Sequence, residues 1–95
     1  MEKEYLERSK MYKAFCDEKR LWIVHLLMDG EKCACALMEE TGMAQSALAY
    51  HMKILCDSSM VKSRQEGKWT FYSLNSQRII DSANYLLALV SQEKK

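Results

Sequence analysis

Residues 41–55, TGMAQSALAYHMKIL, form the stretch that decides the fold. A brief helix is predicted to end near Thr41-Gly42, because a glycine just past the last turn is a common helix stop. A longer helix is predicted to follow, from about Ala44 to Cys56. Two helices joined by a tight glycine-containing turn are typical of a helix-turn-helix, whose second helix enters the major groove of DNA. The stretch therefore predicts a DNA-recognition helix.

The predicted recognition helix has two different faces at about 100° per residue. Its inner face is expected to pack on the core and consists of Leu48, His51, Met52 and Leu55. Its outer face is expected to contact DNA and consists of Gln45, Ser46, Ala49, Tyr50 and Lys53. Short side chains let a helix approach base edges closely. Gln45 can pair with adenine, Ser46 can reach a base or a phosphate, and Lys53 suits a phosphate or guanine. The alternative is a solvated helix face.

Two further helices are predicted before this motif. The first runs from Glu4 to Phe15 and is charged and amphipathic. The second is capped by Asp17, continues through the apolar run at 21–28 and ends at Asp29-Gly30. Because that run is apolar on nearly all sides, we expect several neighbours to bury the helix, with His25 as a satisfied core histidine. A short extended piece at 31–33 then leads into the brief helix.

A hairpin and a last helix are predicted after the motif. Residues 60–64 and 69–74 are rich in β-forming side chains and flank a turn at 65–68 that contains a glycine. The hairpin is cationic because it carries Lys62, Arg64 and Lys68, so it can touch the DNA backbone or a neighbouring groove. These residues can also protect an exposed strand edge, and both roles can hold together. Asn75 or Ser76 can cap the last helix. Its apolar stripe consists of Ile79, Ile80, Ala83, Leu86, Leu87 and Val90.

These elements predict one domain over residues 1–95, of the α+β class but mostly helical, with a winged helix-turn-helix fold. The first and last helices carry more apolar surface than one small core needs. We therefore expect a homodimer held by these two helices, because dimers that bind DNA usually match two half-sites.

The composition narrows the functional class. The net charge is only +1, so a basic DNA-binding surface must come from local clustering. The N-terminus lacks the apolar run of a signal peptide, and no run is long enough to span a bilayer, so no membrane association and a cytoplasmic location are expected. An enzyme is not expected, because no Gly-rich phosphate loop or Cys-His pair is recognisable and the chain leaves little room for a substrate cleft.

Cys33 and Cys35 lie shortly before the predicted recognition helix. Two thiols one residue apart are expected to be too close for an easy disulfide, but they can close on a single soft ion. As(III) and Sb(III) favour three thiolates, and Cd(II) or Pb(II) take three or four ligands. The candidates for a third ligand are Cys16, Cys56 and an outside thiol such as glutathione.

Four segments resemble parts of the ArsR/SmtB family of metal-sensing repressors. They are the opening segment 13–21, the thiol segment 31–35, the recognition helix 45–55 and the wing 61–74. The resemblance implies a homodimeric repressor that binds operator DNA and leaves it when an inducer binds. It also implies a sensor site at Cys33 and Cys35, as in the arsenic- and cadmium-type members. The chain departs from the family's pattern at Ala36, Met38, Ala44 and Tyr50.

A second hypothesis keeps the DNA-binding role but makes the thiols sensors of redox state or reactive sulfur. Because Cys33 and Cys35 are expected to be poorly spaced for a direct disulfide, such a sensor would need Cys16, Cys56 or a link between subunits. The family's other sensor site needs His and carboxylates on the last helix, which here has no His, so nickel or zinc sensing through it is not expected. His51 is expected to serve helix packing.

Overall fold

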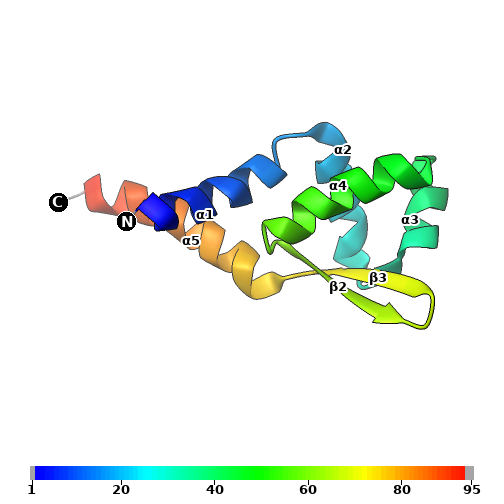
Figure 1. The fold of residues 1–95 in the computed structure, drawn as a ribbon. Helices are drawn as coiled ribbons and strands as arrows, with labels where there is room; N and C mark the ends of the chain where they lie inside the picture. Colours follow the sequence, from blue (N-terminus) through cyan, green and yellow to red (C-terminus); the bar gives the residue numbers. More distant parts are fainter. Residues whose placement is uncertain (1, 94–95) are drawn as a thin grey trace.

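The computed structural model describes residues 2–93, which form a helical body with one β-hairpin (Figure 1). The elements are α1 (Glu2–Ala14), α2 (Glu18–Leu26), the short 3-10 helix η1 (Leu27–Asp29), β1 (Lys32–Cys33), α3 (Ala34–Thr41), α4 (Gln45–Asp57), β2 (Val61–Glu66), β3 (Trp69–Leu74) and α5 (Ser76–Glu93). The strands form an antiparallel sheet in the order β1-β3-β2. The predicted winged helix-turn-helix of mostly helical α+β class is confirmed.

The turn between α3 and α4 has the geometry that the sequence predicts. Gly42 adopts a left-handed conformation with φ of 75°, and its N–H donates to the Met38 carbonyl at 2.8 Å. Glycine takes this conformation without the steric cost that a Cβ brings. The Thr41 hydroxyl accepts a hydrogen bond from the Met43 N–H at 3.2 Å, which closes the turn. The turn therefore sets the angle at which α4 leaves α3.

The core lies where α4 packs against α2, α3 and the base of the hairpin. The buried cluster includes Ile23 of α2, Leu37 of α3 and the inner face of α4. All four inner residues of α4 are buried, namely Leu48, His51, Met52 and Leu55. The predicted inward face of the recognition helix is confirmed.

The expectation that several neighbours bury α2 is wrong. Only Ile23 of this helix is fully buried, whereas Leu21 and Trp22 are 49% and 44% exposed. The helix packs against α3 and α4, and its side that carries Leu21 and Trp22 is largely exposed. His25 lies on that open side and is exposed, so it is not a core histidine. The apolar run also leaves the α-helix at Leu26 and continues as η1.

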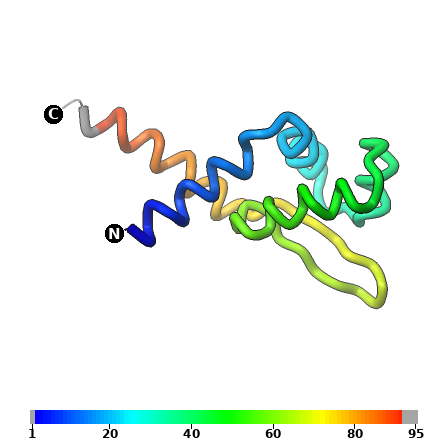
Figure 2. The backbone as a smooth tube through the Cα atoms, turned by 45° about the horizontal axis from the view of Figure 1, so that its top comes forward, coloured from blue at the N-terminus to red at the C-terminus, as the bar shows by residue number. Residues whose placement is uncertain are grey.

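The molecule is elongated, with extents of 51 × 25 × 22 Å. The start of α1 and the end of α5 lie together at one end, and the helix-turn-helix and hairpin lie towards the other (Figures 1 and 2). The Tyr12 hydroxyl donates to the Ser82 carbonyl at 2.8 Å, and Arg8 pairs with Asp81 at 3.3 Å. These contacts hold α1 against one side of α5.

The apolar stripe of α5 lies on another side of that helix and is uncovered. Ile80, Leu86, Leu87 and Val90 are all at least half exposed. Of the two predicted caps for α5, Asn75 is the one used, because its side-chain oxygen accepts from the Arg78 N–H at 3.3 Å. No helix within residues 2–93 is long and apolar enough to cross a membrane.

Candidate DNA-binding surface and thiol site

The outer face of α4 is open to solvent along its whole length. Every predicted contact residue on it is exposed: Gln45, Ser46, Ala49, Tyr50 and Lys53. Tyr50 is 63% exposed, although large aromatic side chains are usually well buried. Lys53 forms an ion pair with Asp57 at 3.2 Å, one turn further along the same helix. The N-cap residue Ala44 makes no side-chain bond, which leaves the first N–H groups of α4 available to a phosphate.

A polar network that the sequence analysis missed fixes the position of α4. Arg20 of α2 donates from Nε to the Ala14 carbonyl at 2.9 Å, and its Nη1 lies 3.2 Å from His51 Nδ1. Asp17 lies 4.0 Å from the same ring nitrogen. The Arg20 backbone N–H, with that of Lys19, holds the pKa of Asp17 below its usual value. His51 thus serves helix packing as expected and also ties α4 to the ends of α1 and α2.

The hairpin carries the predicted cations on exposed positions. The turn of the hairpin consists of Gly67, which has a φ of 63°, and Lys68. It is therefore shorter than the predicted turn at 65–68. Lys68 is exposed, and its Nζ lies 5.8 Å from the centre of the Trp69 ring. This position at the hairpin tip suits contact with a DNA backbone, as expected of a wing.

Arg64 is exposed, but acidic side chains of the same chain already bind its guanidinium. Its Nε and Nη2 donate to the two carboxylate oxygens of Glu31 at 2.7 and 2.8 Å, and its Nη1 donates to Glu66 at 3.2 Å. The guanidinium also lies over the Phe71 ring, 4.6 Å from its centre. The hydrogen bonds from Arg64 hold the pKa of Glu31 below its usual value. A DNA phosphate would have to compete with Glu31 for this side chain.

The two thiol residues lie where β1 gives way to α3. Cys33 ends β1 and is the N-cap of α3, with its sulfur accepting from the Ala36 N–H at 3.2 Å. Cys35 is exposed in the first turn of that helix. The structure joins the two sulfurs in a disulfide, so the expectation that they are too close for one is wrong. The change from extended to helical backbone sets their Cα atoms 5.3 Å apart, within the usual disulfide range.

The other two cysteines are free. Cys16 is exposed in the connection between α1 and α2. Cys56 near the end of α4 is partly buried, and this burial raises the pKa of its thiol. Among the side chains that the structure describes, those of residues 2–91, no three His, Cys, Asp or Glu gather closely enough to hold a metal ion. Within a single chain, Cys16 therefore does not lie close enough to Cys33 and Cys35 to serve as a third ligand.

The thiol segment is connected to both elements that are predicted to contact DNA. On one side, β1 pairs with β3, with Cys33 opposite Phe71, and the Glu31–Arg64 bonds join the same segment to β2. On the other side, α3 packs against α4 through Leu37, which is fully buried. The thiol segment therefore contacts both the hairpin and α4 through its neighbours β3 and α3.

Comparison with known proteins identifies the family. Residues 17–63 match the family described as bacterial regulatory protein, arsR family. The chain is 39% identical over 72 residues to the arsenical resistance operon repressor of Bacillus subtilis, covering 75% of this chain and 69% of that protein. It is 38% identical over 87 residues to the repressor of the same description from Staphylococcus xylosus, covering 92% and 83%. The chain belongs to the arsR family.

A solved structure supports the same assignment. The arsR-family chain superposes with a TM-score of 0.75 on the homodimeric winged helix-turn-helix DNA-binding domain of Mb0332 from Mycobacterium bovis, a possible ArsR-family transcriptional regulator. The two are 25% identical, and the match covers 98% of this chain and 86% of that one. The protein is accordingly a DNA-binding transcriptional regulator and not an enzyme.

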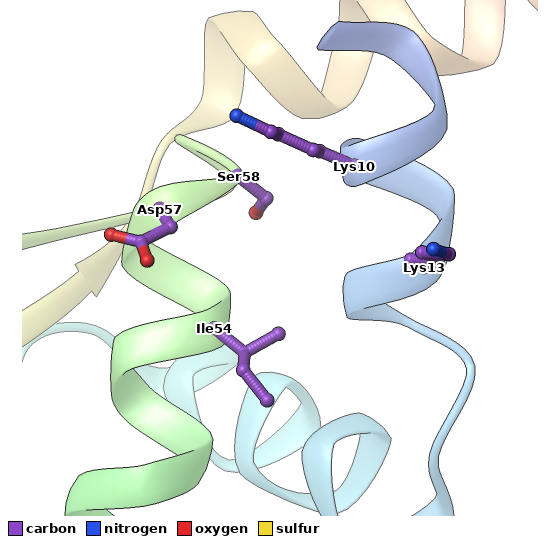
Figure 3. A pocket seen from close by; sticks show the side chains of 5 residues that line it. All are labelled: Lys10, Lys13, Ile54, Asp57 and Ser58. Carbon is purple, nitrogen blue, oxygen red and sulfur yellow. The ribbon is translucent and has the colours of Figure 1, made fainter. Parts of the chain in front are cut away.

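One hollow of this arsR-family protein lies apart from the thiols. It has a volume of about 390 Å³ and is lined by Lys10 and Lys13 of α1 and by Ile54, Asp57 and Ser58 at the end of α4 (Figure 3). Lys10 extends across it towards Ser58, and Ile54 points from α4 towards α1. No cysteine lines it, so it is not part of the thiol site.

Proposed function

We propose that this regulator is a homodimeric repressor that leaves its operator when As(III) or Sb(III), or another thiophilic ion such as Cd(II) or Pb(II), binds Cys33 and Cys35 in the cytoplasm. The observation that carries the proposal is the position of the thiol pair. It caps α3, which supports the recognition helix, and it pairs through β1 with the wing. The relatives described as arsenical resistance operon repressors support the choice of inducer.

The donor set suits a soft ion. Thiolates are the ligands that As(III), Sb(III) and Cd(II) prefer. The two sulfurs come from residues on either side of Ala34 and are bonded to each other, which supports a position that they can share around one ion. The N-terminus of α3 stabilises negative charge there, because its free N–H groups and its dipole face the sulfurs. The pair therefore fits an ion that takes two thiolates from one chain, provided that the disulfide is first reduced.

Binding of such an ion would disturb the cap of α3. Cys33 sulfur now accepts from the Ala36 N–H. A sulfur whose lone pair is shared with an ion is a poorer acceptor, and the ion draws Cys35 into a new geometry. Because α3 packs on α4 and β1 pairs with β3, the shift reaches the surface that reads DNA.

The required energy is modest. A hundredfold loss of operator affinity corresponds to about 2.7 kcal/mol of differential binding between the free and DNA-bound states. A dimer with one ion per chain would divide this into about 1.4 kcal/mol per site. This is close to the net contribution of one hydrogen bond, so the loss of the cap bond with a small shift of the wing is sufficient.

Dimerisation would place two recognition surfaces on one operator. Tyr5 and Leu6 of α1 are exposed, as is the stripe on α5, and the start of α1 lies beside α5 at one end of the molecule (Figure 1). An apolar face of this kind is stable in water when a second copy covers it. A twofold dimer would then match two half-sites of operator DNA.

A second candidate function is favoured by one specific observation, the bond between Cys33 and Cys35. The two thiols could give two electrons and two protons to an oxidant such as a peroxide or a polysulfide and close to this disulfide. The regulator would then sense redox state or reactive sulfur through the same residues. The disulfide needs neither Cys16 nor Cys56, contrary to the sequence-based expectation.

The test is operator binding measured by fluorescence anisotropy. The purified protein, reduced with a phosphine, is used to select a binding duplex from a random pool, and the complex is titrated with arsenite. We expect release from the wild type but not from Cys33→Ser or Cys35→Ser, which should still bind the duplex. Cys56→Ser, with the thiol pair intact, is the matched control and should respond.

Two results would contradict the proposal. Release by arsenite from the double Cys33→Ser/Cys35→Ser variant would place the inducer elsewhere. Release by peroxide or polysulfide alone, with no effect of any metal or metalloid, would favour the redox function. Loss of response in Cys16→Ser would make Cys16 a ligand contributed by the partner subunit.

A further inference from the structure

A second hollow lies directly beside the thiol pair. It has a volume of about 300 Å³ and opens between α3, the start of α4 and the tip of the wing. Its lining includes Cys35, Met38, Gln45, Lys68, Trp69 and Thr70. Neither α1 nor α5 contributes to it. A space of this size is at the small end of ligand-binding pockets and suits a single small molecule.

The thiol pair is an incomplete ligand set for As(III). Trivalent arsenic favours three thiolates, and Cys33 and Cys35 supply two. All four cysteines lie within residues 2–91, whose side chains the structure describes, and no third His, Cys, Asp or Glu in this range is close enough to complete a site. The third ligand of the arsenic would therefore come from outside the chain, and the hollow beside Cys35 is the adjoining space that could hold it.

We propose that a small thiol carrying carboxylate groups occupies this hollow and supplies the third thiolate to As(III) held by Cys33 and Cys35. The inference rests on the proposed function, because it requires arsenic at the thiol pair. The step is a ligand exchange without oxidation. Arsenous acid, As(OH)₃, exchanges its three As–O bonds for three As–S bonds, and the three S–H protons leave with the three hydroxyl groups as three waters.

The charge and polarity of the hollow define this ligand. Lys68 offers a cation at the rim and forms no ion pair with another residue that the structure describes. Met38 and Trp69 offer apolar contacts, and the Gln45 amide can bond to a peptide or carboxylate group. The Thr70 hydroxyl donates to the Gln65 side-chain oxygen at 3.1 Å and can accept a hydrogen bond from a peptide N–H. A thiol with a carboxylate and an amide backbone satisfies all of these groups, whereas a thiol with an amine would meet the like charge of Lys68.

The same ligand would compete with DNA. Gln45 opens the recognition helix and Lys68 is at the tip of the wing, and both are predicted to contact DNA. A molecule bound between them would take up the groups that otherwise reach bases and phosphates. The thiol would therefore increase the release that arsenite causes.

The experiment uses the full chain with Trp22→Phe, so that Trp69 in the hollow is the sole tryptophan. The protein is reduced with a phosphine, loaded with one equivalent of arsenite and titrated with either reduced glutathione or cysteamine. Trp69 fluorescence gives the affinity for the thiol. Native mass spectrometry counts the arsenic and thiol molecules bound per chain.

Three variants test the site. Lys68→Glu reverses the charge at the rim, and Lys62→Glu makes the same change on β2 outside this hollow. Met38→Cys places a thiol three residues after Cys35, on the same face of α3, so the chain itself can supply the third sulfur.

We expect one glutathione per bound arsenic, with an affinity about tenfold higher than that for cysteamine. Lys68→Glu should weaken glutathione binding by about tenfold and Lys62→Glu by less than about twofold. Met38→Cys should bind arsenic without added glutathione.

Three results would overturn the inference while the proposed function stands: arsenic bound at Cys33 and Cys35 without any thiol adduct, equal binding of glutathione and cysteamine with no effect of Lys68→Glu, or loss of bound arsenic in Cys16→Ser or Cys56→Ser. Arsenic loading that is unchanged in Cys33→Ser/Cys35→Ser would overturn the proposed function itself.

Discussion

Removal of the Lys68 charge should change how salt affects operator binding. Lys68 is exposed at the wing tip, its Nζ lies 5.8 Å from the centre of the Trp69 ring, and it forms no ion pair with the residues that the structure describes. Its ammonium is therefore free to replace a counterion on a DNA phosphate. Arg64 on the same hairpin is a contrasting case, because Glu31 and Glu66 already hold its guanidinium.

The size of the effect follows from counterion release. Each phosphate contact contributes about 0.9 to the slope of log affinity against log salt concentration. A dimer carries two copies of Lys68, so Lys68→Ala should reduce the slope by about 1.8. Between 50 and 200 mM salt, a fourfold change, the advantage of the wild type over the variant should then shrink by about twelvefold. Arg64→Ala should change the slope by less than about half as much, because its charge is already neutralised within the chain.

The assay is fluorescence anisotropy of a selected duplex at four or five salt concentrations, with each protein reduced. Circular dichroism of Lys68→Ala checks that the fold is intact. A slope identical to that of the wild type would mean that the wing tip does not reach the DNA backbone. A larger change for Arg64→Ala than for Lys68→Ala would mean that DNA breaks the Glu31–Arg64 pair and that Arg64 is the main contact.

Two further predictions concern the dimer and the position of α4. Leu86→Glu should convert the dimer to a monomer at micromolar concentration and thereby weaken DNA binding. Asn84→Glu, on the polar side of the same helix, is the control and should change neither property. Sedimentation that shows a wild-type monomer would refute the α5 interface. Asp17→Ala removes the α2 cap and should lower Tm by about 5 °C at pH 7. Because folding lowers the pKa of Asp17, the contribution of its carboxylate to stability is present above about pH 4 and is lost as the pH falls further. The difference in Tm between the wild type and Asp17→Ala should therefore shrink below that pH. A difference that stays constant down to pH 2 would contradict this.

The helix-turn-helix could be predicted because its determinants are local. The period of the apolar residues in α4 placed Leu48, Met52 and Leu55 inward, and the structure buries all three. Gly42 marked the turn because the chain needs a left-handed residue there. The burial of α2 could not be predicted in this way, since the pattern around Trp22 shows how apolar a helix is but not how many neighbours it has.

The thiol site was only partly predictable for a similar reason. Spacing alone suggested that Cys33 and Cys35 could share an ion, but their approach depends on the residue at which β1 becomes α3. The bonds between Glu31 and Arg64 join residues 33 positions apart, and no local pattern contains such a pairing. The contacts of the recognition helix and wing with DNA remain predictions.

The most direct test of the account compares arsenite binding with and without DNA. Isothermal titration of the reduced protein with arsenite is carried out alone and then with a saturating amount of the selected duplex. Linkage requires that arsenite bind the DNA-free protein more tightly, and that the affinity ratios at the two sites of a dimer multiply to the factor by which arsenite weakens DNA binding. We predict a difference of about tenfold or more per site, which disappears in Cys33→Ser/Cys35→Ser. Equal arsenite affinities in the presence and absence of DNA would contradict the proposal that ion binding at these thiols controls the affinity for the operator.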